Sequence, residues 1–422
     1  MNILIIGAGG REHTIAWKIK QSNKTDKIFA IPGNAGISKL AECFNIDIMD
    51  NNALIEFAKE HDIGLTIVGP EIPLVNGIVD EFEKNSLRIL GPNKEAAQIE
   101  GSKVFSKILM QKYNVPTGKA EIFDNPEEAI EFVKNNDWAR VIKADGPAAG
   151  KGVIICDTEE EAIDAINKIL VDKEFGDVGN QILVEEKLAG EEASFIVFTD
   201  GNAIKPMVTS QDHKRVFDDD KGLNTGGMGA YSPAPVITEE LSKEVINTVI
   251  KPTIDGMKAE GISFKGFLYA GLMITENGIK VLEFNARLGD PETQVILPRL
   301  KTDLVEVANA VVDGNLGSLE LEWDNRPAVS VVLASGGYPE HYEKGKVITG
   351  LDEAEKLAIV FHAGTRLEGS DILTNGGRVL NVTALGDSIK DAIDKSYEAV
   401  EKIKFDGAHY RKDIGFRALE RD

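Results

Sequence analysis

The sequence has few cysteines and no long hydrophobic run. Cys43 and Cys156 are the only cysteines among 422 residues, which leaves neither a disulfide framework nor a cysteine zinc site. No apolar stretch approaches the roughly 18 residues that a membrane-spanning helix needs. Met1 leads directly into an apolar run, without the basic segment of a targeting peptide. We therefore expect a soluble protein of the cytoplasm.

Positive charge is also scarce. The chain has 69 acidic and 47 basic residues, which gives a formal net charge of −22. Because binding to a polyanion requires positive charge against phosphates, this balance argues against nucleic acids and anionic membranes as partners. The remaining composition, with 42% hydrophobic and 27% charged residues, is that of a globular protein, and the length predicts two or three domains.

Four short apolar runs near the N-terminus alternate with helical patterns. Each run is closed by Gly or Pro, which is typical of a parallel βα sheet. The ligand sites of such sheets lie at the carboxyl ends of the strands. We assign an N-terminal α/β domain to residues 1–101, with strands expected at Asn2–Ile6, Lys27–Ile31, Leu65–Val68 and Leu87–Leu90.

The rest of the chain mixes helices with antiparallel strands. We expect a central domain at residues 102–323 that contains a small α+β flap at about 118–190. Ser102 is expected to cap a helix from Lys103 to about Gln111, and a further helix is expected at about Thr238–Glu260. Two apolar runs, Gly266–Thr275 and Gly278–Asn285, meet at an Asn-Gly pair and predict a β-hairpin. Residues 210–235 show no period and are expected to form a long loop. A strand-rich α+β domain at 324–422 contains an amphipathic helix, Ser388–Ile403.

The glycine-rich turn after the first expected strand matches only part of a dinucleotide-binding fingerprint. The third glycine of that fingerprint would stand where the chain has Glu12, and no acidic residue closes the second strand. Nicotinamide binding is therefore disfavoured. The turn either holds a phosphate at a helix N-terminus or is a tight βα turn without a ligand.

The segment from Lys143 to Val153 places small residues around a lysine, between two expected strands. It is not a Walker A loop, because Gly152 stands where a Ser or Thr would hold magnesium. Small residues let backbone N–H groups approach phosphate oxygens, with Lys151 as a mobile cation and Lys143 fixed in the preceding strand. The alternative is a flexible hairpin that carries a solvated lysine.

Glu283, Asn285 and Arg287 alternate at the end of an expected strand, so that their side chains share one face. Carboxylate and amide oxygens suit a magnesium ion that takes its other ligands from water and substrate phosphates. Arg287 would neutralise charge on a transferred phosphoryl group, and Asp290 follows in a tight turn. The alternative is an exposed strand face without a ligand.

A basic cluster, Gln211-Asp-His-Lys-Arg215, opens the long glycine-rich segment. Three potential cations in a chain of such negative charge suggest a site for an anion or an amino acid. Basic clusters of this kind are also found fully solvated on protein surfaces, and the sequence leaves that alternative open.

Together these motifs resemble the phosphoribosylamine–glycine ligase family (glycinamide ribonucleotide synthetases), whose central region has the ATP-grasp fold. The resemblance extends over essentially the whole chain. Two positions differ from the family's sequence pattern, Pro147 in the flap and the run Ala286-Arg287-Leu288 after Asn285. Neither difference removes a lysine, an arginine, a carboxylate or the Asn285 amide from the pattern. The segments that carry the resemblance are Gly7–His13, Pro32–Gly36, Val68–Pro73, Lys143–Val153, Glu191–Phe195, Ser210–Val216, Asn224–Pro235, Gly266–Met273, Glu283–Thr293, Gly336–Pro339, Thr374–Val382 and Arg411–Arg417.

The resemblance implies a role for each matching residue. The residues implied to bind ATP are Lys103, Lys143, Gly150, Lys151, Gly152, Glu185, Glu186, Leu188 and Glu192. Those implied to hold the metal are Glu283 and Asn285, and those implied in catalysis are Lys151 and Arg287. Those implied to bind glycine, its acyl phosphate or phosphoribosylamine are Gly9, Asn34, Glu71, Asp212, His213, Lys214, Arg215, Asn224, Thr225, Gly226, Gly227, Gly229, Arg287 and Asp290.

The activity that the resemblance implies joins glycine to 5-phosphoribosylamine at the expense of ATP, through glycyl phosphate, in purine biosynthesis. The implied cofactors are ATP and Mg²⁺ or Mn²⁺, the implied partners are these small molecules, and the implied assembly is a monomer or weak homo-oligomer. Three alternatives are another ATP-grasp carboxylate–amine ligase, a nicotinamide-dependent oxidoreductase and a catalytically silent nucleotide-binding regulator.

Overall fold

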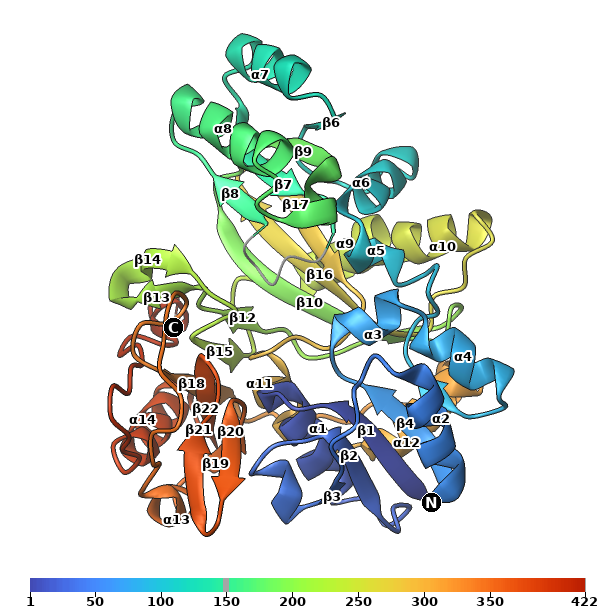
Figure 1. Ribbon diagram of the computed structural model, residues 1–422, viewed down its shortest axis with the longest axis vertical. Helices are drawn as coiled ribbons and strands as arrows, with labels where there is room; N and C mark the ends of the chain where they lie inside the picture. Colours follow the sequence, from blue (N-terminus) through green and yellow to red (C-terminus); the bar gives the residue numbers. More distant parts are fainter. Residues whose placement is uncertain (147–151, 422) are drawn as a thin grey trace.

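The computed structural model describes residues 1–146 and 152–421. Its N-terminal part is a five-stranded parallel sheet in the order β3-β2-β1-β4-β5 (Figure 1). The sequence predicts a parallel sheet here, and the structure confirms it. Helices cover both faces of the sheet, which is why its short strands are apolar on both sides. Its elements are β1 (Asn2–Gly7), α1 (Gly10–Ile19), β2 (Ile28–Pro32), β3 (Glu42–Cys43), α2 (Asn51–Glu60), β4 (Ile63–Val68), α3 (Glu71–Val75), α4 (Ile78–Lys84) and β5 (Ile89–Leu90).

A small antiparallel sheet in the order β6-β9-β7-β8 forms the predicted flap. It follows α6, whose predicted N-cap is confirmed because the hydroxyl of Ser102 accepts a hydrogen bond from the Phe105 backbone N–H at 2.9 Å. Two helices, α7 and α8, cover one face of the flap (Figure 1). The elements are α5 (Gln98–Gly101), α6 (Lys103–Lys112), β6 (Ala120–Phe123), α7 (Pro126–Asn135), β7 (Ala139–Ala144), β8 (Val153–Ile155), α8 (Glu159–Ile166) and β9 (Ile182–Glu186).

The central sheet has the order β11-β10-β16-β17 and contains the predicted hairpin with its predicted bounds. The helix expected at about residues 238–260 is also present, as α9 and α10 joined by a π-helical turn at Ile246–Ile250. The elements are β10 (Glu191–Thr199), β11 (Ile204–Pro206), α9 (Glu239–Val245), α10 (Lys251–Ala259), β16 (Gly266–Thr275), β17 (Gly278–Asn285), α11 (Thr293–Ile296) and α12 (Leu304–Val312).

The C-terminal sheet has the order β12-β15-β18-β22-β19, and its first two strands correct the sequence prediction. Residues 210–235 are not a loop without regular structure but contain four short strands, β12 (Gln211–Asp212), β13 (Arg215–Phe217), β14 (Lys221–Asn224) and β15 (Gly229–Ser232). Strands of two to four residues are too short to show a period of two in the sequence. Pairing between β15 and β18 fixes this segment on the C-terminal sheet.

The remaining C-terminal elements complete that sheet and cover it. The predicted amphipathic helix is present as α14, packed on β18 and β22. The elements are β18 (Ala328–Ala334), α13 (Leu351–Ala354), β19 (Ile359–His362), β20 (Thr365–Glu368), β21 (Asp371–Thr374), β22 (Arg378–Leu385), α14 (Ile389–Val400) and α15 (Phe416–Leu419).

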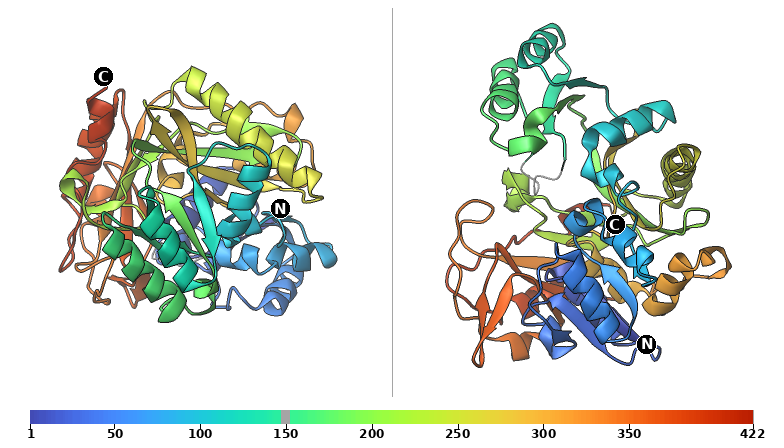
Figure 2. Two further views of the ribbon diagram at one scale, coloured as in Figure 1. Left: turned by 90° about the horizontal axis from the view of Figure 1, so that it is seen from above. Right: turned by 45° about the vertical axis from the view of Figure 1, so that its right-hand side comes forward.

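The parts are arranged so that the flap stands away from the rest, while the N-terminal and C-terminal sheets lie beside each other at the opposite end (Figures 1 and 2). The central sheet connects them. None of the helices in the described ranges is long and apolar enough to cross a bilayer.

Two buried histidines join the N-terminal and C-terminal sheets. The Nδ1 atom of His13 on α1 accepts a hydrogen bond from the backbone N–H of His362 on β19 at 2.7 Å. The amide of Asn34 donates to the carbonyls of Ala8 and His362, each at 2.8 Å. Burial lowers the pKa of both imidazoles, and the pKa of His362 falls to about 3. Both rings are therefore neutral in the folded protein near pH 7.

This contact predicts acid sensitivity. Because the pKa of His362 falls from 6.5 to about 3 on folding, its stabilising contribution is present above pH 6.5 and is lost as the pH falls toward 3. Between pH 7 and pH 5, the wild type should lose about 2 kcal/mol more stability than His362→Gln. Thermal unfolding followed by circular dichroism at both pH values measures the difference. The exposed His341→Gln should behave as the wild type, and an equal loss in His362→Gln would contradict the assignment.

Candidate active site

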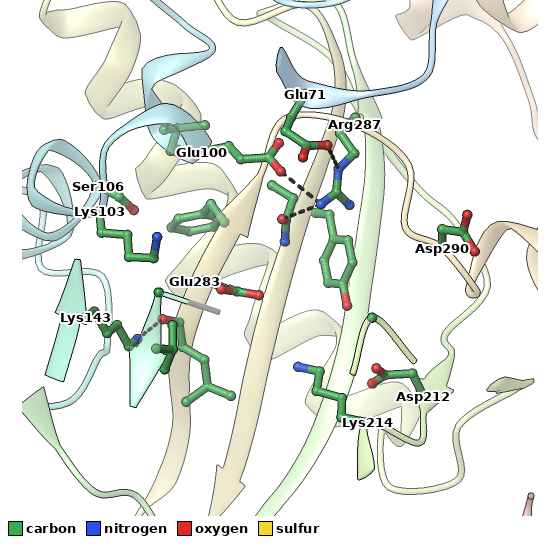
Figure 3. Close-up of a pocket in the computed structure, with 18 of the residues that line it drawn as sticks. Glu71, Glu100, Lys103, Ser106, Lys143, Asp212, Lys214, Glu283, Arg287 and Asp290 are labelled. Atoms are coloured by element: carbon green, nitrogen blue, oxygen red, sulfur yellow. Dashed lines mark hydrogen bonds and ion pairs between the residues drawn. The ribbon is translucent and has the colours of Figure 1, made fainter. Parts of the chain in front are cut away.

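A polar cleft opens between the flap, the central sheet and the N-terminal domain. Its volume is about 440 Å³, within the usual range for a site that binds small molecules. Its walls come from α3, α5, α6, β7, β9, β12, β16, β17 and the turn before α11 (Figure 3). The predicted residues that it brings together are Glu71, Lys103, Lys143, Gly152, Glu185, Asp212, Lys214, Thr225, Gly226, Glu283, Asn285, Arg287 and Asp290.

Buried cations line the end of the cleft beneath the flap. The Glu185 carboxylate forms ion pairs with the ammonium groups of Lys143 at 2.6 Å and Lys107 at 2.7 Å. Lys143 also donates to the carbonyl of Leu282 at 3.0 Å. Burial alone would raise the pKa of Glu185, but the two lysines outweigh it and hold the pKa below its usual value. This end of the cleft therefore keeps a buried negative group and two cations charged together.

Lys103 extends this group of cations, and Lys107 is a member that sequence reasoning missed. Lys103 donates to the Gly146 carbonyl at 2.7 Å, and burial lowers its pKa. The two lysines are four residues apart on α6, and side chains at that spacing share one helix face. The spacing from Lys103 would have been enough to identify Lys107.

Arg287 lies at the centre of the cleft and links three elements. Its Nη2 atom donates to the Asn285 amide oxygen at 2.9 Å and pairs with Glu100 at 2.9 Å, while Nε lies 3.5 Å from a Glu71 oxygen. Burial would lower the pKa of Arg287, but the two carboxylates raise it above its usual value. Burial raises the pKa of Glu100. Burial acts in the same direction at Glu71, but Arg287 and Arg11 together with a backbone hydrogen bond hold the pKa of Glu71 below its usual value. Sequence reasoning missed Glu100.

Glu283 and Asn285 supply oxygen atoms between Arg287 and the lysines. Within residues 1–146 and 152–421, the Glu283 carboxylate has no hydrogen bond and no ion pair, and it points into the cleft (Figure 3). The same residues contain no group of three or more His, Cys, Asp or Glu side chains that could hold a metal ion. A free carboxylate beside an amide oxygen fits a magnesium-like ion that takes its other ligands from phosphates and water.

A hydrogen-bond network that the sequence did not reveal lies on the side away from the flap. One oxygen of Glu292 accepts hydrogen bonds from the Tyr269 hydroxyl at 2.6 Å and the Ser194 hydroxyl at 3.0 Å. Asp212 at the end of β12 and Lys214 just after it line the cleft, and Lys214 pairs with Glu192 at 2.8 Å. The sequence placed Asp290 in this turn, but only the fold shows which strands supply the partners of its neighbour Glu292.

A second pocket adjoins the first, between the N-terminal strand ends and the C-terminal sheet. It contains the predicted residues Gly9 and Asn34. Asp290 and Arg378 line both pockets and form an ion pair at 3.4 Å. Sequence reasoning missed its other polar lining residues, which include Tyr338, Thr365, Arg366, Asn375 and Arg378.

Several predicted residues lie elsewhere. The Glu192 carboxylate pairs with Lys214, the Glu186 carboxylate accepts from the Lys119 backbone at 3.1 Å, and the Arg215 guanidinium donates to the Gly222 carbonyl at 2.7 Å. Among the described residues, the predicted positions outside both pocket linings are Glu186, Leu188, Glu192, His213, Arg215, Asn224, Gly227 and Gly229. The positions outside the described residues are Pro147, Gly150 and Lys151.

Comparison with known proteins covers all three parts of the chain. Residues 1–100 match the phosphoribosylglycinamide synthetase N domain, residues 101–293 its ATP-grasp (A) domain, and residues 328–417 its C domain. The chain belongs to the phosphoribosylamine–glycine ligase family. This membership confirms the resemblance seen in the sequence and its ATP-grasp fold class.

Individual family members match over their full length. The phosphoribosylamine–glycine ligase of Yersinia pestis is 54% identical over 426 residues, and that of Neisseria meningitidis serogroup B is 52% identical over 423, each covering 100% of both chains. The crystal structure of the Thermotoga maritima ligase superposes with a TM-score of 0.86 at 35% identity, over 98% of this chain and 100% of that one. A biotin carboxylase domain from Hydrogenobacter thermophilus, 17% identical with a TM-score of 0.73 over 97% of this chain and 91% of that one, shares the fold.

In this family member the C-terminal segment contacts the residues that follow Asp212, from His213 to Asp220. The fully buried Arg411 guanidinium donates to both oxygens of Asp413 at 2.7 Å and to Asp220 at 2.8 Å. The backbone N–H of Gly415 donates to Nε2 of His213 at 3.0 Å. His213 therefore faces the C-terminal segment, and this contact anchors the residue between Asp212 and Lys214.

Arg411→Met tests this anchor. Removing one partner of a buried ion pair leaves uncompensated charge, and the expected loss of stability is about 3 kcal/mol. Thermal unfolding followed by circular dichroism measures it as a lower Tm. Arg326→Met, which removes a surface pair with Asp324, should change stability by less than about 0.5 kcal/mol. An equal effect of the two variants would contradict the anchoring role.

Proposed function

We propose that this protein joins glycine to 5-phosphoribosylamine, with ATP converted to ADP and phosphate, to give glycinamide ribonucleotide in purine biosynthesis. The observation that carries the proposal is the pair of adjoining pockets. One contains buried lysines and the Glu283 carboxylate, which has no partner within residues 1–146 and 152–421, as a nucleoside triphosphate and its metal require. Both pockets are lined by Asp290 and Arg378. The full-length similarity to ligases of this name supports the same substrates.

ATP would lie beneath the flap. In our proposal Lys103, Lys107 and Lys143 contact its phosphates. Among the described residues, Glu185 is the one carboxylate that pairs with these ammonium groups, and their other partners are the Thr117 hydroxyl and backbone carbonyls. Gly150, Lys151 and Gly152 would cover the phosphates from above. For the rest of ATP we retain the assignments from the family resemblance, with adenine beside Glu185, Glu186 and Leu188 and the ribose hydroxyls beside Glu192.

Glu283 and Asn285 would hold the magnesium or manganese ion that accompanies ATP. Both supply oxygen atoms, the donor type that hard divalent cations prefer. When bound, such an ion neutralises charge on the β- and γ-phosphates. Arg287 keeps Asn285 in place by donating to its amide oxygen at 2.9 Å.

Glycine must be activated before an amine can attack it, because a carboxylate is a poor electrophile. Its carboxylate oxygen would attack the γ-phosphate in line and form glycyl phosphate, and catalysis of this step would come from positioning and charge stabilisation by Arg287 and Lys151. The glycine site in our proposal is built from Asp290 and the segments Asp212–Arg215 and Asn224–Gly229, where Thr225 and Gly226 line the cleft. Exclusion of water protects the acyl phosphate.

Phosphoribosylamine would occupy the second pocket and reach into the first with its amine. Gly9 and Asn34 line that pocket at the carboxyl ends of the parallel strands, and Glu71 lines the first pocket nearby. Arg366 and Arg378 add positive charge for a phosphate group. The amine attacks the carbonyl of glycyl phosphate and phosphate leaves.

The domain organisation of the chain is proposed from its sequence pattern and its family resemblance. We propose domains at residues 1–101, 102–323 with the flap at about 118–190, and 324–422. We also propose a monomer or weak homo-oligomer located in the cytoplasm.

The proposed function is tested by phosphate release from ATP and Mg²⁺, with glycine and freshly made phosphoribosylamine each present or absent. We expect release that requires both substrates, with glycinamide ribonucleotide identified by mass. Release only with other acid–amine pairs would identify a different ATP-grasp ligase. Bound ATP without release under any pairing would identify a nucleotide-binding regulator.

Glu283→Gln tests the proposed metal site. The variant keeps the size of the side chain but removes the charge that holds the cation, and ADP formation should fall by about 10²–10³-fold. Glu276→Gln lies at the exposed turn of the same hairpin and should keep wild-type turnover. Near wild-type turnover in a folded Glu283→Gln protein would contradict the assignment.

A further inference from the structure

Both backbone hydrogen-bonding groups of Gly226 are bound by side chains of the second pocket. The N–H of Gly226 donates to the Tyr338 hydroxyl at 3.0 Å, and its carbonyl accepts from Nη1 of Arg378 at 2.7 Å. Gly226 lines the first pocket, whereas Tyr338 and Arg378 line both pockets. These two side chains are therefore a direct physical link between the pockets.

Arg378 makes a second link, to the turn that contains Asp290. Its Nη1 atom donates to the Asp290 backbone carbonyl at 2.7 Å and lies 3.4 Å from the Asp290 carboxylate. Within residues 1–146 and 152–421, the Nε and Nη2 atoms of Arg378 have no hydrogen-bond partner, and the side chain is 21% exposed. Arg378 can thus bind a ligand through these two nitrogen atoms without releasing Gly226 or Asp290.

Gly226 has room for this arrangement because it has no side chain. A β-carbon at this position would lie 3.0 Å from Cζ and 3.1 Å from Nη2 of Arg378, closer than side chains normally pack. The guanidinium therefore lies directly against the backbone of the first pocket, and a displacement of one must displace the other.

The hydrogen bonds continue from Gly226 into the proposed glycine site. Thr225 donates to the Lys214 carbonyl at 2.8 Å from its backbone N–H, and at 2.8 Å from its hydroxyl. The same hydroxyl accepts from the Gly227 N–H at 2.9 Å. Thr225 and Lys214 both line the first pocket. The position of Gly226 consequently affects residues that would surround glycine.

We propose that Tyr338 and Arg378 couple the two pockets, so that a sugar phosphate in the second pocket and glycine in the first bind cooperatively. The inference rests on the proposed function and adds two positioning residues to it. A sugar phosphate that contacts Arg378 and Tyr338 fixes both side chains, and through them Gly226 and the Asp290 turn. The first ligand then bears the entropy cost of ordering these groups, so the second ligand binds more tightly.

Such coupling suits a reaction that passes through an acyl phosphate. Glycyl phosphate is hydrolysed by water if no amine is present to attack it. Cooperative binding fills the glycine site chiefly when the amine substrate already occupies the second pocket. Glycine is then activated mainly in protein molecules that can complete the reaction.

The coupling is measured by binding alone, with ribose 5-phosphate as the probe. This compound has a hydroxyl group where phosphoribosylamine has its amine. Equilibrium dialysis with labelled glycine, Mg²⁺ and a non-hydrolysable ATP analogue gives the Kd of glycine with and without ribose 5-phosphate. We expect ribose 5-phosphate to lower this Kd at least about 5-fold, and glycine to lower the Kd of ribose 5-phosphate by the same factor, because coupling is reciprocal.

Two variants should weaken the coupling. Tyr338→Phe removes only the hydroxyl that accepts from Gly226, and the coupling factor should fall at least about 2-fold. Arg378→Lys keeps a positive charge for phosphate but lacks the planar set of donors that reaches both pockets, and its factor should fall to about 1.

Tyr342→Phe is the matched control. The Tyr342 ring packs against that of Tyr338 with centroids 6.2 Å apart, but among the described residues it belongs to neither pocket lining. This variant should keep the coupling factor of the wild type.

Other outcomes overturn the proposal. A wild type in which ribose 5-phosphate leaves the Kd of glycine unchanged, or raises it, has no such coupling, although the proposed function would stand. Variants that bind glycine more weakly by an equal factor with and without ribose 5-phosphate would show a merely structural role. If Arg378→Lys does not fold, Tyr338→Phe decides the question. A wild type that fails to bind glycine or ribose 5-phosphate contradicts the proposed function itself, and the inference falls with it.

Discussion

The buried guanidinium of Arg287 is the interaction on which the rest of the site depends. It follows the last strand of the central sheet, yet its carboxylate partners Glu71 and Glu100 come from the N-terminal third of the chain. A buried cation is costly unless it is paired, so these elements stabilise the protein fully only when they meet. The same guanidinium fixes Asn285, and the position of the proposed metal site thus depends on contact between the N-terminal domain and the central sheet.

Charge pairing also explains how an acidic protein can build a site for anions. The cleft contains seven carboxylates, but five are bound to arginines, lysines, hydroxyls or amides that keep them in the walls. Lys103, Lys107 and Lys143 remain in a small volume beneath the flap. The net charge of −22 describes the protein as a whole, whereas the electrostatic potential inside the cleft depends on which of its charged groups are paired.

The C-terminal sheet contributes to the site directly, through Arg378 at the start of β22, and also through the strands that it fixes. It takes β12 and β15 from the middle of the chain, and the segment from Arg411 to Gly415 holds their neighbours from the other side. Asp212 ends β12, and Lys214 lies in the short connection between β12 and β13. Because β12 and β15 belong to the C-terminal sheet, the packing of that sheet affects where both residues lie.

The sequence alone determined the elements whose cause is local. Apolar runs closed by Gly or Pro predicted the parallel strands, the Asn-Gly pair predicted the β16–β17 hairpin, and Ser102 predicted the start of α6. The alternation of Glu283, Asn285 and Arg287 predicted one shared site, and all three line the cleft. In each case the information lies within a few residues, where backbone geometry or strand period decides the outcome.

Only the tertiary structure decided which distant groups become partners. The sequence analysis assigned no role to Glu100, Tyr269 or Arg378, because the groups that they contact come from other parts of the chain. Lys107 was missed as well, although its spacing from Lys103 on α6 indicates it. The strands of residues 211–232 were missed because they are too short to show a period. Of the four, β15 pairs with β18 and β12 pairs with β15, while β13 and β14 pair with each other. Whether a carboxylate has a hydrogen-bond or ion-pair partner also depends on the neighbours that folding supplies. Within residues 1–146 and 152–421, Asp212 and Glu283 have no such partner, unlike the other five acidic residues of the cleft.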